Sequence, residues 1–379
     1  MQQKGGDSRL VLATEGGVKR RHLLHIFPSF GVGGSQSRLL QLIRAYKDTY
    51  SHTIVALDGC YDMAAQMPEA APIAYLQLDK RNGLAAISQI RSVIADARPN
   101  VLITHNWGSI EWAFVSRVFG LGRHVHIEDG FGPEERDRQL RRRVLFRRLA
   151  LGGLNTIVVL PSRTLVRIAT QQWRLPEKSL RYIANGIDCA RFAVVRKKAE
   201  QGEPLIIGTV ASLRPEKNLK RLIRAFALVR MDRPLANLRL MIVGNGSERN
   251  ALQDFASEVG CGDAIIFVGA TDKPETYLAQ MRIFAMSSDT EQMPLTVLEA
   301  MASGLPIVST DVGDIANMVS EGNRPLITKL SDEQGLRKSL IALIDSPATG
   351  EALGLLNREK AFANFNYAQM ACEYAKLFD

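Results

Sequence analysis

Short apolar segments alternate with longer amphipathic segments along nearly the whole chain. The apolar segments are rich in Val, Ile and Leu with little polar alternation, which is typical of parallel strands buried on both faces. The segments between them repeat apolar residues at helical spacing, so the pattern predicts an α/β protein built from two doubly wound units. Strands are expected at 22–27, 52–57, 73–78, 100–105, 124–129, 155–160 and 180–184, and then at 204–210, 238–244, 264–269, 282–287 and 305–310.

The apolar periodicity lapses at 185–204, where Gly, Pro and charged residues gather. We therefore expect an N-terminal Rossmann-like domain at 1–188 and a C-terminal domain at 189–362. Two doubly wound sheets that face each other place the carboxyl ends of their strands, and with them a ligand crevice, between the domains.

Composition narrows the class of protein. The 379 residues are 46% hydrophobic and 23% charged, as in soluble globular proteins, and the net charge of +9 favours an anionic partner. The four cysteines are scattered without a CxxC pair, which argues against a zinc site and a disulfide framework. Residues 1–22 lack the apolar core of a signal peptide, and no run reaches the ~18 apolar residues of a membrane-spanning helix. We expect a cytoplasmic protein.

A glycine cluster, GVGGSQ at 31–36, lies between a predicted strand and a predicted helix. Gln36 occupies the position of the last glycine in GxGxxG, and Arg249 occupies it in the second such loop, so neither loop is a dinucleotide fingerprint. A turn that leads into a helix N-terminus still favours a bound anion. A plain β–α turn explains the same residues, and both interpretations remain open.

The segment SSDTEQMPLTVLEAMASGLPIVSTDVGD at 287–314 carries the most specific chemistry. Pro294 suits the first turn of a helix, and Glu299 lies on the apolar stripe of that helix, four residues after Leu295. Glu291 precedes the helix and lies about two turns above Glu299. The two carboxylates are placed to hold hydroxyls on either side of a diphosphate. The alternative is a solvated Glu291 and a Glu299 that pairs with an internal arginine.

Two cations follow the first strand of the second half. Arg214 and Lys217 lie in the loop of GTVASLRPEKNLKRLIRAF, where they would face the crevice and neutralise a leaving phosphate. A solvated pair of cations is the alternative.

Together these segments resemble the family 4 retaining glycosyltransferases of the GT-B fold. The resemblance runs in order along nearly the whole chain, and its most specific part is the pair Glu291 and Glu299 followed by AMASGLPIV. The other segments that carry it are GVGGSQ, VVLPSRTL, IANGIDCARF, ASLRPEKNLKRLIRAF, IVGNGSERNAL and IIFVGAT.

The resemblance implies transfer of a sugar from a UDP- or GDP-linked donor to a glycan or lipid-linked acceptor, as in cell-surface polysaccharide synthesis, with retained anomeric configuration and no metal ion or other cofactor. It also implies that the helix at 363–379 crosses back to the first domain. By the same resemblance Glu299 holds the ribose and Glu291 the donor sugar. The other donor-binding positions it implies are Gly33, Gly34, Met293, Pro294, Leu295, Gly269 and Ala270.

Three residues depart from the family pattern. Ser212 replaces an arginine, and Arg214 is expected to supply the missing charge. Gln292 replaces a glycine beside the donor sugar. Asp129 stands where many members have a histidine near the reacting sugar, so a catalytic role is expected for it. His105 and His126 are further candidates for contact with sugar or acceptor.

Other functions stay open at this stage. A sugar-nucleotide epimerase would share the crevice, and a non-catalytic binder of sugar nucleotides or anionic glycans would share the charge. The segment at 134–151 predicts a basic helix with Leu140, Val144, Leu145 and Leu149 on one face and arginines, among them Arg138, on the others. That helix either packs on the core or contacts anionic lipid at the inner membrane face. Nucleic-acid binding is not expected, because Phe146 is the single aromatic residue among these arginines.

Overall fold

The computed structural model describes residues 20–79, 81–131, 133–135, 139–193, 202–330 and 332–379. The expectation for the N-terminal segment therefore lies largely outside the described residues. Arg138 and residues 194–201 of the predicted domain boundary also lie outside them.

The first sheet is formed by parallel strands in the order β3-β2-β1-β4-β5-β6-β7. The strand order reverses between β1 and β4, and a ligand crevice in a doubly wound sheet lies at such a switch point. The strands are β1 (Arg21–Phe27), β2 (Tyr50–Ala56), β3 (Ile73–Leu76), β4 (Val101–His105), β5 (His124–Ile127), β6 (Thr156–Leu160) and β7 (Leu180–Tyr182).

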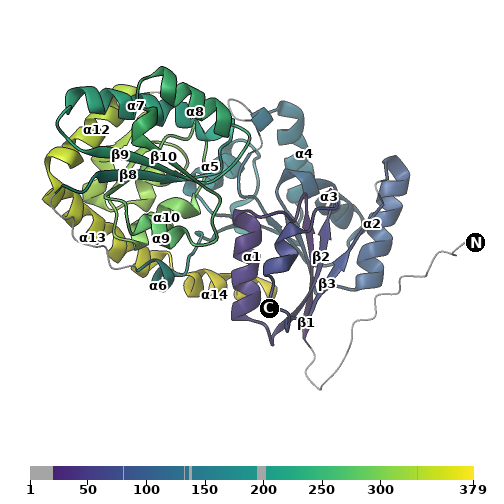
Figure 1. Ribbon diagram of the computed structural model, residues 1–379. Helices are drawn as coiled ribbons and strands as arrows, with labels where there is room; N and C mark the ends of the chain where they lie inside the picture. The colour runs from purple at the N-terminus through teal and green to yellow at the C-terminus, as the bar shows by residue number, and fades with distance from the viewer. Residues whose placement is uncertain (1–19, 80, 132, 136–138, 194–201, 331) are drawn as a thin grey trace, which may run out of the picture.

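The second sheet repeats this design with parallel strands in the order β10-β9-β8-β11-β12-β13, so its switch point falls between β8 and β11. Figure 1 shows the two sheets in separate lobes of the molecule. The strands are β8 (Leu205–Val210), β9 (Leu238–Val243), β10 (Ile265–Gly269), β11 (Ile283–Met286), β12 (Ile307–Thr310) and β13 (Ile327–Thr328).

The predicted fold class is confirmed, and every strand expected from the apolar pattern is present. Only β13 was not predicted, because two residues at a sheet edge give no periodic signal.

Helices cover the sheets. They are α1 (Gly34–Ala45), α2 (Gly83–Ala97), α3 (Ile110–Phe119), α4 (Arg141–Leu151), α5 (Arg163–Gln171), α6 (Cys189–Phe192), α7 (Leu219–Asp232), α8 (Arg249–Glu258), α9 (Pro274–Leu278), α10 (Leu295–Ala302), α11 (Ile315–Met318), α12 (Glu333–Asp345), α13 (Pro347–Asn364) and α14 (Tyr367–Phe378).

The last helix joins the two lobes. Figure 1 shows α14 beside α1 of the first lobe, although α13 belongs to the second. Met370, Tyr374 and Phe378 of α14 share a buried core with Leu23 and Tyr50 of the first sheet. The apolar face of α14 thus anchors the end of the chain on the N-terminal domain.

No single helix in the described part of the chain is long and apolar enough to cross a bilayer. The segments Gln334–Asp345 and Pro347–Asn364 pass that test only together, and they bend by 106° at their junction.

Candidate active site

The loops at the two switch points bring most of the predicted site residues together. The glycine turn follows β1, and Asp129 follows β5, which is the neighbour of β4 in the sheet. In the second domain Lys217 follows β8 and Glu291 follows β11. Because the carboxyl ends of parallel strands lie at one edge of a sheet, both groups of loops lie where the two domains meet, and this is where we expect the ligand crevice.

Two helix N-termini approach each other across this crevice. Gly33 is the extended N-cap of α1, and a Cβ placed on Gly34 would lie 3.7 Å from Leu295 Cδ1 at the start of α10. Neither N-terminus has a side-chain cap, since Gly33 and Pro294 are the N-cap residues. The free N–H groups and the dipoles of both helices favour an anion between them.

Gln36, which breaks the dinucleotide fingerprint, braces the glycine turn from inside. Its Nε2 donates a hydrogen bond to the Ser29 carbonyl at 2.7 Å, and its Oε1 would lie 2.8 Å from a Cβ on Gly33. A larger residue at position 33 would therefore displace the Gln36 side chain from the turn. This turn is held by a side-chain contact that the fingerprint sequence would not provide.

Glu291 forms an ion pair with Lys217. Lys217 Nζ lies 2.5 Å from Glu291 Oε1, which also accepts a hydrogen bond from Ser288 Oγ at 2.8 Å. No described residue bonds to the second carboxylate oxygen, Oε2. The interpretation of Glu291 as a solvated loop acid is wrong, because the side chain is only 12% exposed and is held by two donors.

Glu299 has no ion-pair partner among the residues that the structure describes. Burial raises the pKa of its carboxyl to about 7, an effect that Arg191 opposes and Glu275 strengthens. Arg191 itself is paired with Glu275 at 2.8 Å. The alternative of a Glu299 paired with an internal arginine is therefore not realised. In the described part of the chain no group donates a hydrogen bond to this carboxylate, so it keeps the capacity to accept one from a ligand.

A buried arginine that the sequence did not single out fixes the loop just before Glu291. Arg221 of α7 donates to the Ser287 carbonyl at 2.7 Å and pairs with Asp289 at 2.8 Å. Arg214, by contrast, is exposed, and its guanidinium forms no hydrogen bond or ion pair with a described residue. Arg221 thus holds the loop just before Glu291, whereas the Arg214 side chain extends into solvent.

Asp129 is fixed on the other side of the crevice. Both of its oxygens accept hydrogen bonds from Arg38 of α1, at 2.6 and 2.7 Å, and its backbone N–H donates to Asn106 Oδ1 at 2.7 Å. Asn106 has a φ of 57°, a left-handed conformation that is strained for a residue with a side chain. The structure thus uses two further residues, Arg38 and Asn106, to hold Asp129 at the edge of the sheet.

The two candidate histidines lie in the core. His105 stacks on Phe27 with ring centroids 3.7 Å apart, and burial lowers its pKa well below the ordinary value. His126 is fully buried, with Nδ1 2.8 Å from Thr104 Oγ1. Both rings lie inside the domain, 2% and 0% exposed, so the structure does not support direct contact of either ring with a sugar.

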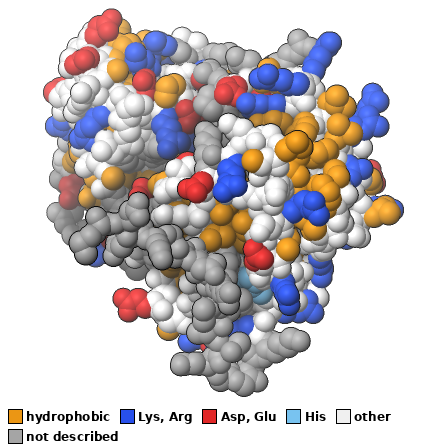
Figure 2. All heavy atoms as spheres, turned by 90° about the vertical axis from the view of Figure 1, so that its right-hand side faces the viewer, with side chains coloured by type: hydrophobic (Ala, Val, Ile, Leu, Met, Phe, Trp, Pro, Cys, Tyr) orange, Lys and Arg blue, Asp and Glu red, His pale blue; other side chains and the backbone are white. Residues whose placement is uncertain are grey.

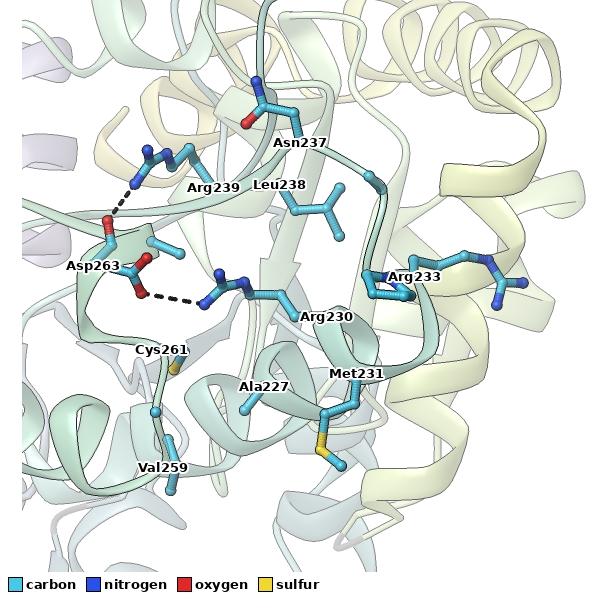
Figure 3. Close-up of a pocket in the computed structure, with 14 residues that line it drawn as sticks. Ala227, Arg230, Met231, Arg233, Asn237, Leu238, Arg239, Val259, Cys261 and Asp263 are labelled. Carbon is cyan, nitrogen blue, oxygen red and sulfur yellow. Dashed lines mark hydrogen bonds and ion pairs between the residues drawn. The ribbon is translucent and has the colours of Figure 1, made fainter.

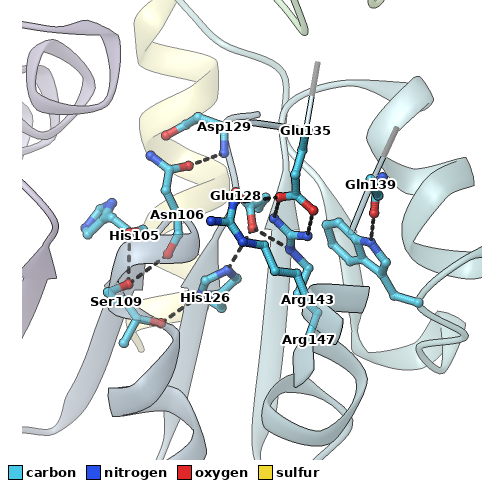
Figure 4. A network of polar contacts seen from close by, with 12 residues as sticks. His105, Asn106, Ser109, His126, Glu128, Asp129, Glu135, Gln139, Arg143 and Arg147 are labelled. Atoms are coloured by element: carbon cyan, nitrogen blue, oxygen red, sulfur yellow. Dashed lines mark hydrogen bonds and ion pairs between the residues drawn. The ribbon is translucent and has the colours of Figure 1, made fainter. Parts of the chain in front are cut away.

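A buried ionic network lies next to His126 (Figure 4). Arg147 of α4 is fully buried and donates to both oxygens of Glu135, at 3.1 and 2.8 Å. Its Nε lies 3.5 Å from Glu128, the residue that precedes Asp129. Its guanidinium also packs over the rings of Trp107, Phe131 and Trp173. This network fixes the chain on both sides of Asp129, so α4 has an anchoring role for the crevice.

The loop at 287–294, which we call the donor loop after its expected ligand, contacts the first domain directly. Ser162 Oγ donates to Gln292 Oε1 at 3.1 Å, and Gln292 Cγ would lie 3.2 Å from a Cβ on Gly130. Asp314 accepts the backbone N–H groups of Arg163 and Thr164, at 2.6 and 2.9 Å, and so caps α5 across the domain boundary. Gln292, which departs from the family pattern, therefore contacts the loop that carries Asp129.

The proposed base-binding segment has an irregular backbone. Gly269 has a φ of 97°, and the pairing of β10 with β9 shifts in register before it. The Gly269 carbonyl accepts a hydrogen bond from the Gly244 N–H at 2.8 Å, and Ala270 is exposed. The turn lies at the carboxyl edge of the second sheet, and its role toward a base stays a prediction.

A pocket of about 370 Å³ in the second domain lies at the opposite edge of the sheet (Figure 3). It is formed by the end of α7 and the starts of β9 and β10. Arg230 pairs with the Asp263 carboxylate at 3.3 Å, whereas Arg239 donates to the backbone carbonyl of Asp263. This pocket does not include any of the predicted site residues.

The outer face of α4 differs from the prediction. Leu145 and Leu149 are 57% and 47% exposed, whereas Arg147 is buried. Figure 2 faces the side of the molecule that carries α2, and hydrophobic side chains gather there among Lys and Arg residues. The name α2–α3–α4 face is used below for a set of exposed residues on and beside these helices. Its apolar members are Leu84, Val118, Phe119, Leu145, Leu149 and Leu154, and its basic members are Arg91, Arg117, Arg141, Arg142 and Arg148.

The fold and the site define a GT-B protein, and comparison with known families agrees. Residues 33–186 match the family model described as "Glycosyl transferase 4-like domain", and residues 191–360 match "Glycosyl transferases group 1". The chain belongs to this glycosyltransferase family.

Individual relatives are distant. N-acetyl-alpha-D-glucosaminyl L-malate synthase of Bacillus anthracis is 24% identical over 59% of this chain and 59% of its own length. GDP-mannose-dependent alpha-(1-6)-phosphatidylinositol monomannoside mannosyltransferase of Mycolicibacterium smegmatis is 26% identical over 53% of this chain and 56% of its own length. The chain thus matches little more than half the length of these relatives.

Solved structures confirm the fold over a longer range. HepE of Anabaena in complex with UDP superposes with a TM-score of 0.78 at 16% identity, over 94% of this chain and 98% of that one. WaaG, a glycosyltransferase of lipopolysaccharide biosynthesis, superposes with a TM-score of 0.74 at 13% identity, over 94% and 99% of the two chains.

Proposed function

We propose that this protein is a retaining glycosyltransferase that moves a sugar from a UDP- or GDP-linked donor to a glycan or lipid-linked acceptor in the synthesis of a cell-surface polysaccharide or glycoconjugate. The observation that carries the proposal is the pair of carboxylates beside the uncapped start of α10. Glu291 has one oxygen held by Lys217 and Ser288 and the other open, and Glu299 has no partner among the described residues.

In the proposed reaction the bond between the anomeric carbon and the diphosphate oxygen breaks, and its electron pair leaves with the phosphate. Arg214, Lys217 and the N-terminus of α10 stabilise the charge that develops on that oxygen, without a metal ion. The acceptor hydroxyl attacks from the same face of the sugar. Its proton passes to the leaving phosphate oxygen or to Asp129.

We also propose that the acceptor is presented at a membrane and that the α2–α3–α4 face contacts anionic lipid. Exposed leucines offer apolar contact, and each arginine near an anionic surface contributes about 1 kcal/mol of attraction. The proposal is consistent with the relative from M. smegmatis, whose name specifies a phosphatidylinositol mannoside acceptor.

The decisive experiment is a panel of sugar nucleotides tested for thermal stabilisation, followed by product analysis with the donors that bind. A ligand at ~100 times its dissociation constant adds about 2.7 kcal/mol to the free energy of unfolding, so binding donors stand out. The proposal is supported if nucleotide is released from an α-linked donor, with transfer or hydrolysis of its sugar, and if the product is also α-linked. Interconversion of free sugar nucleotides would indicate an epimerase, and binding without turnover a binding protein; either result contradicts the proposal.

A further inference from the structure

A polar connection joins the two domains, and the reaction outlined above uses only its first member, Asp129. It begins at Asp129 and continues through Arg38, whose side chain is only 4% exposed. Arg38 Nη1 also donates to Asn185 Oδ1 at 3.0 Å, and Asn185 Nδ2 donates to the Met293 carbonyl at 2.9 Å. Met293 directly precedes Pro294, the N-cap of α10. The acceptor-side carboxylate is thus tied to the donor loop through two intermediate side chains.

Arg38 is buried and forms an ion pair with Asp129 in which each side chain depends on the other. Burial opposes the charge of the Arg38 guanidinium, but the Asp129 carboxylate raises the pKa of Arg38 above its ordinary value, so the arginine remains charged. The pair is bidentate, which fixes the plane of the carboxylate as well as its distance. Arg38 also lies 5.8 Å from the ring of Tyr374 in α14, which limits its movement away from Asp129.

Asn185 belongs to the segment that links the two domains. Its backbone N–H lies 3.2 Å from Met293 Sδ, so both its backbone and its side chain contact the donor loop. A shift of the second domain relative to the first would therefore disturb Asn185, and through it Arg38. Conversely, a displacement of Arg38 would disturb Asn185 and the donor loop, because a coupling between two sites is reciprocal.

We infer that Arg38 is the positioning residue for Asp129 and that Asn185 couples this pair to the donor loop, so that the acceptor-side carboxylate reaches its working position only with the domains in this arrangement. The inference rests on the proposed function, because it assigns Arg38 an effect on transfer through Asp129. Arg38 itself need not contact either substrate.

The test is a double-mutant cycle with Arg38→Ala, Asp129→Asn and the double variant. Each is measured for kcat, for acceptor KM and for nucleotide affinity, with active sites counted by nucleotide titration so that unfolded protein does not enter kcat. Misplacement of a reacting group by about 1 Å costs on the order of 10²-fold in rate. We therefore expect Arg38→Ala to lower kcat about 10²-fold and nucleotide affinity little. The double variant should match Asp129→Asn, because Arg38 acts only through that carboxylate.

Chemical rescue separates positioning from a purely structural role. Added guanidinium should restore much of the kcat of Arg38→Ala and none of that of the double variant. Asn185→Ala should lower kcat by a smaller factor, since the bidentate pair remains. The matched control is Arg337→Ala, which removes the bidentate partner of Asp232 on α7 and should leave kcat unchanged.

Several outcomes overturn the inference. Additive losses in the double variant, absence of guanidinium rescue, or a loss confined to nucleotide affinity would show that Arg38 does not act through Asp129. Wild-type turnover by Asp129→Asn would do the same while leaving the glycosyltransferase proposal intact. Failure of the wild-type protein to turn over any donor would instead contradict the proposed function itself.

Discussion

The ammonium group of Lys217 lies 2.5 Å from Oε1 of Glu291, although 74 residues separate the two in the chain. The contact joins the loop after β8 to the loop after β11, the two strands at the switch point of the second sheet. It leaves Oε2 of Glu291 open while it holds the carboxylate in place. Lys217 is thereby positioned beside both the expected sugar and the expected phosphate.

Glu291→Gln should reduce turnover while nucleotide affinity stays close to that of the wild type. The amide keeps the size of the side chain but loses the charge that Lys217 holds and the acceptor for a sugar hydroxyl. Loss of one hydrogen bond to a charged group corresponds to roughly 10- to 100-fold in kcat. Steady-state kinetics and calorimetry with free nucleotide check this, and Glu258→Gln on the exposed end of α8 is the control. Equal loss of nucleotide affinity and turnover would contradict the assignment to the sugar.

Glu299→Gln should weaken nucleotide binding and yet stabilise the ligand-free protein. The folded pKa of about 7 lies above the ordinary value of 4.5, so the wild-type protein loses stability as the pH rises from about 4.5 through 7. The glutamine variant has no such loss. Its advantage in melting temperature should therefore be small near pH 5 and larger near pH 8, and a constant difference across this range would show that Glu299 does not titrate as inferred.

The sequence predicted the strands and the acidic helix because both depend on local pattern and spacing. It did not predict Arg38, Arg147 or Arg221, which are 4%, 0% and 7% exposed. Each lies on the buried stripe of its helix, with Leu42, Leu151 and Ala225 four residues further on. That position is a signal of a paired internal arginine, since an unpaired one is costly to bury.

The partners of these arginines could not be read from the sequence. Asp129 lies 91 residues from Arg38, and the two meet only because β5 ends near the start of α1 at the same edge of the sheet. The contacts of Gln292 and Asp314 depend in the same way on how one domain is placed against the other. The sequence placed these residues at the ends of strands, but it could not show the contacts that hold them.

Turnover should not depend on a divalent metal ion. Lys217 and the exposed Arg214 would take the place of the ion on the diphosphate. We expect full activity in EDTA. We also expect Arg214→Ala to lower kcat by roughly 10-fold or more. Activity that disappears in EDTA and returns with manganese would show instead that the diphosphate is held through a cation.

The N-terminal domain should lose stability before the C-terminal domain on acidification. All six histidines of the chain lie between residues 22 and 126, and all are buried. Burial lowers the pKa of His52 and His124 to about 3, and it lowers that of His22, His25 and His105 as well. Neutral folded histidines stabilise the protein above pH 6.5, and this contribution is lost as the pH falls below it.

Each histidine that ionises only on unfolding changes the free energy of unfolding by about 1.4 kcal/mol per pH unit below its unfolded pKa. Hydrogen exchange followed from pH 7 to pH 5 should therefore show protection lost first in β1, β2, β4 and β5. The second sheet, which contains no histidine, is the internal control. Equal loss in both sheets would assign acid sensitivity to other groups.

The last prediction concerns the α2–α3–α4 face. If it contacts lipid, the protein should bind vesicles that contain phosphatidylglycerol and not vesicles of phosphatidylcholine alone, and salt should weaken binding. Leu145→Gln with Leu149→Gln removes apolar contact without changing charge, so it should lower the vesicle affinity and leave turnover of a short water-soluble acceptor unchanged. Leu235→Gln is the matched control, because that leucine is fully exposed in the second domain. Sedimentation with vesicles measures the affinity. If the double leucine variant and the control sediment alike with anionic vesicles, the two leucines of α4 do not enter the lipid surface.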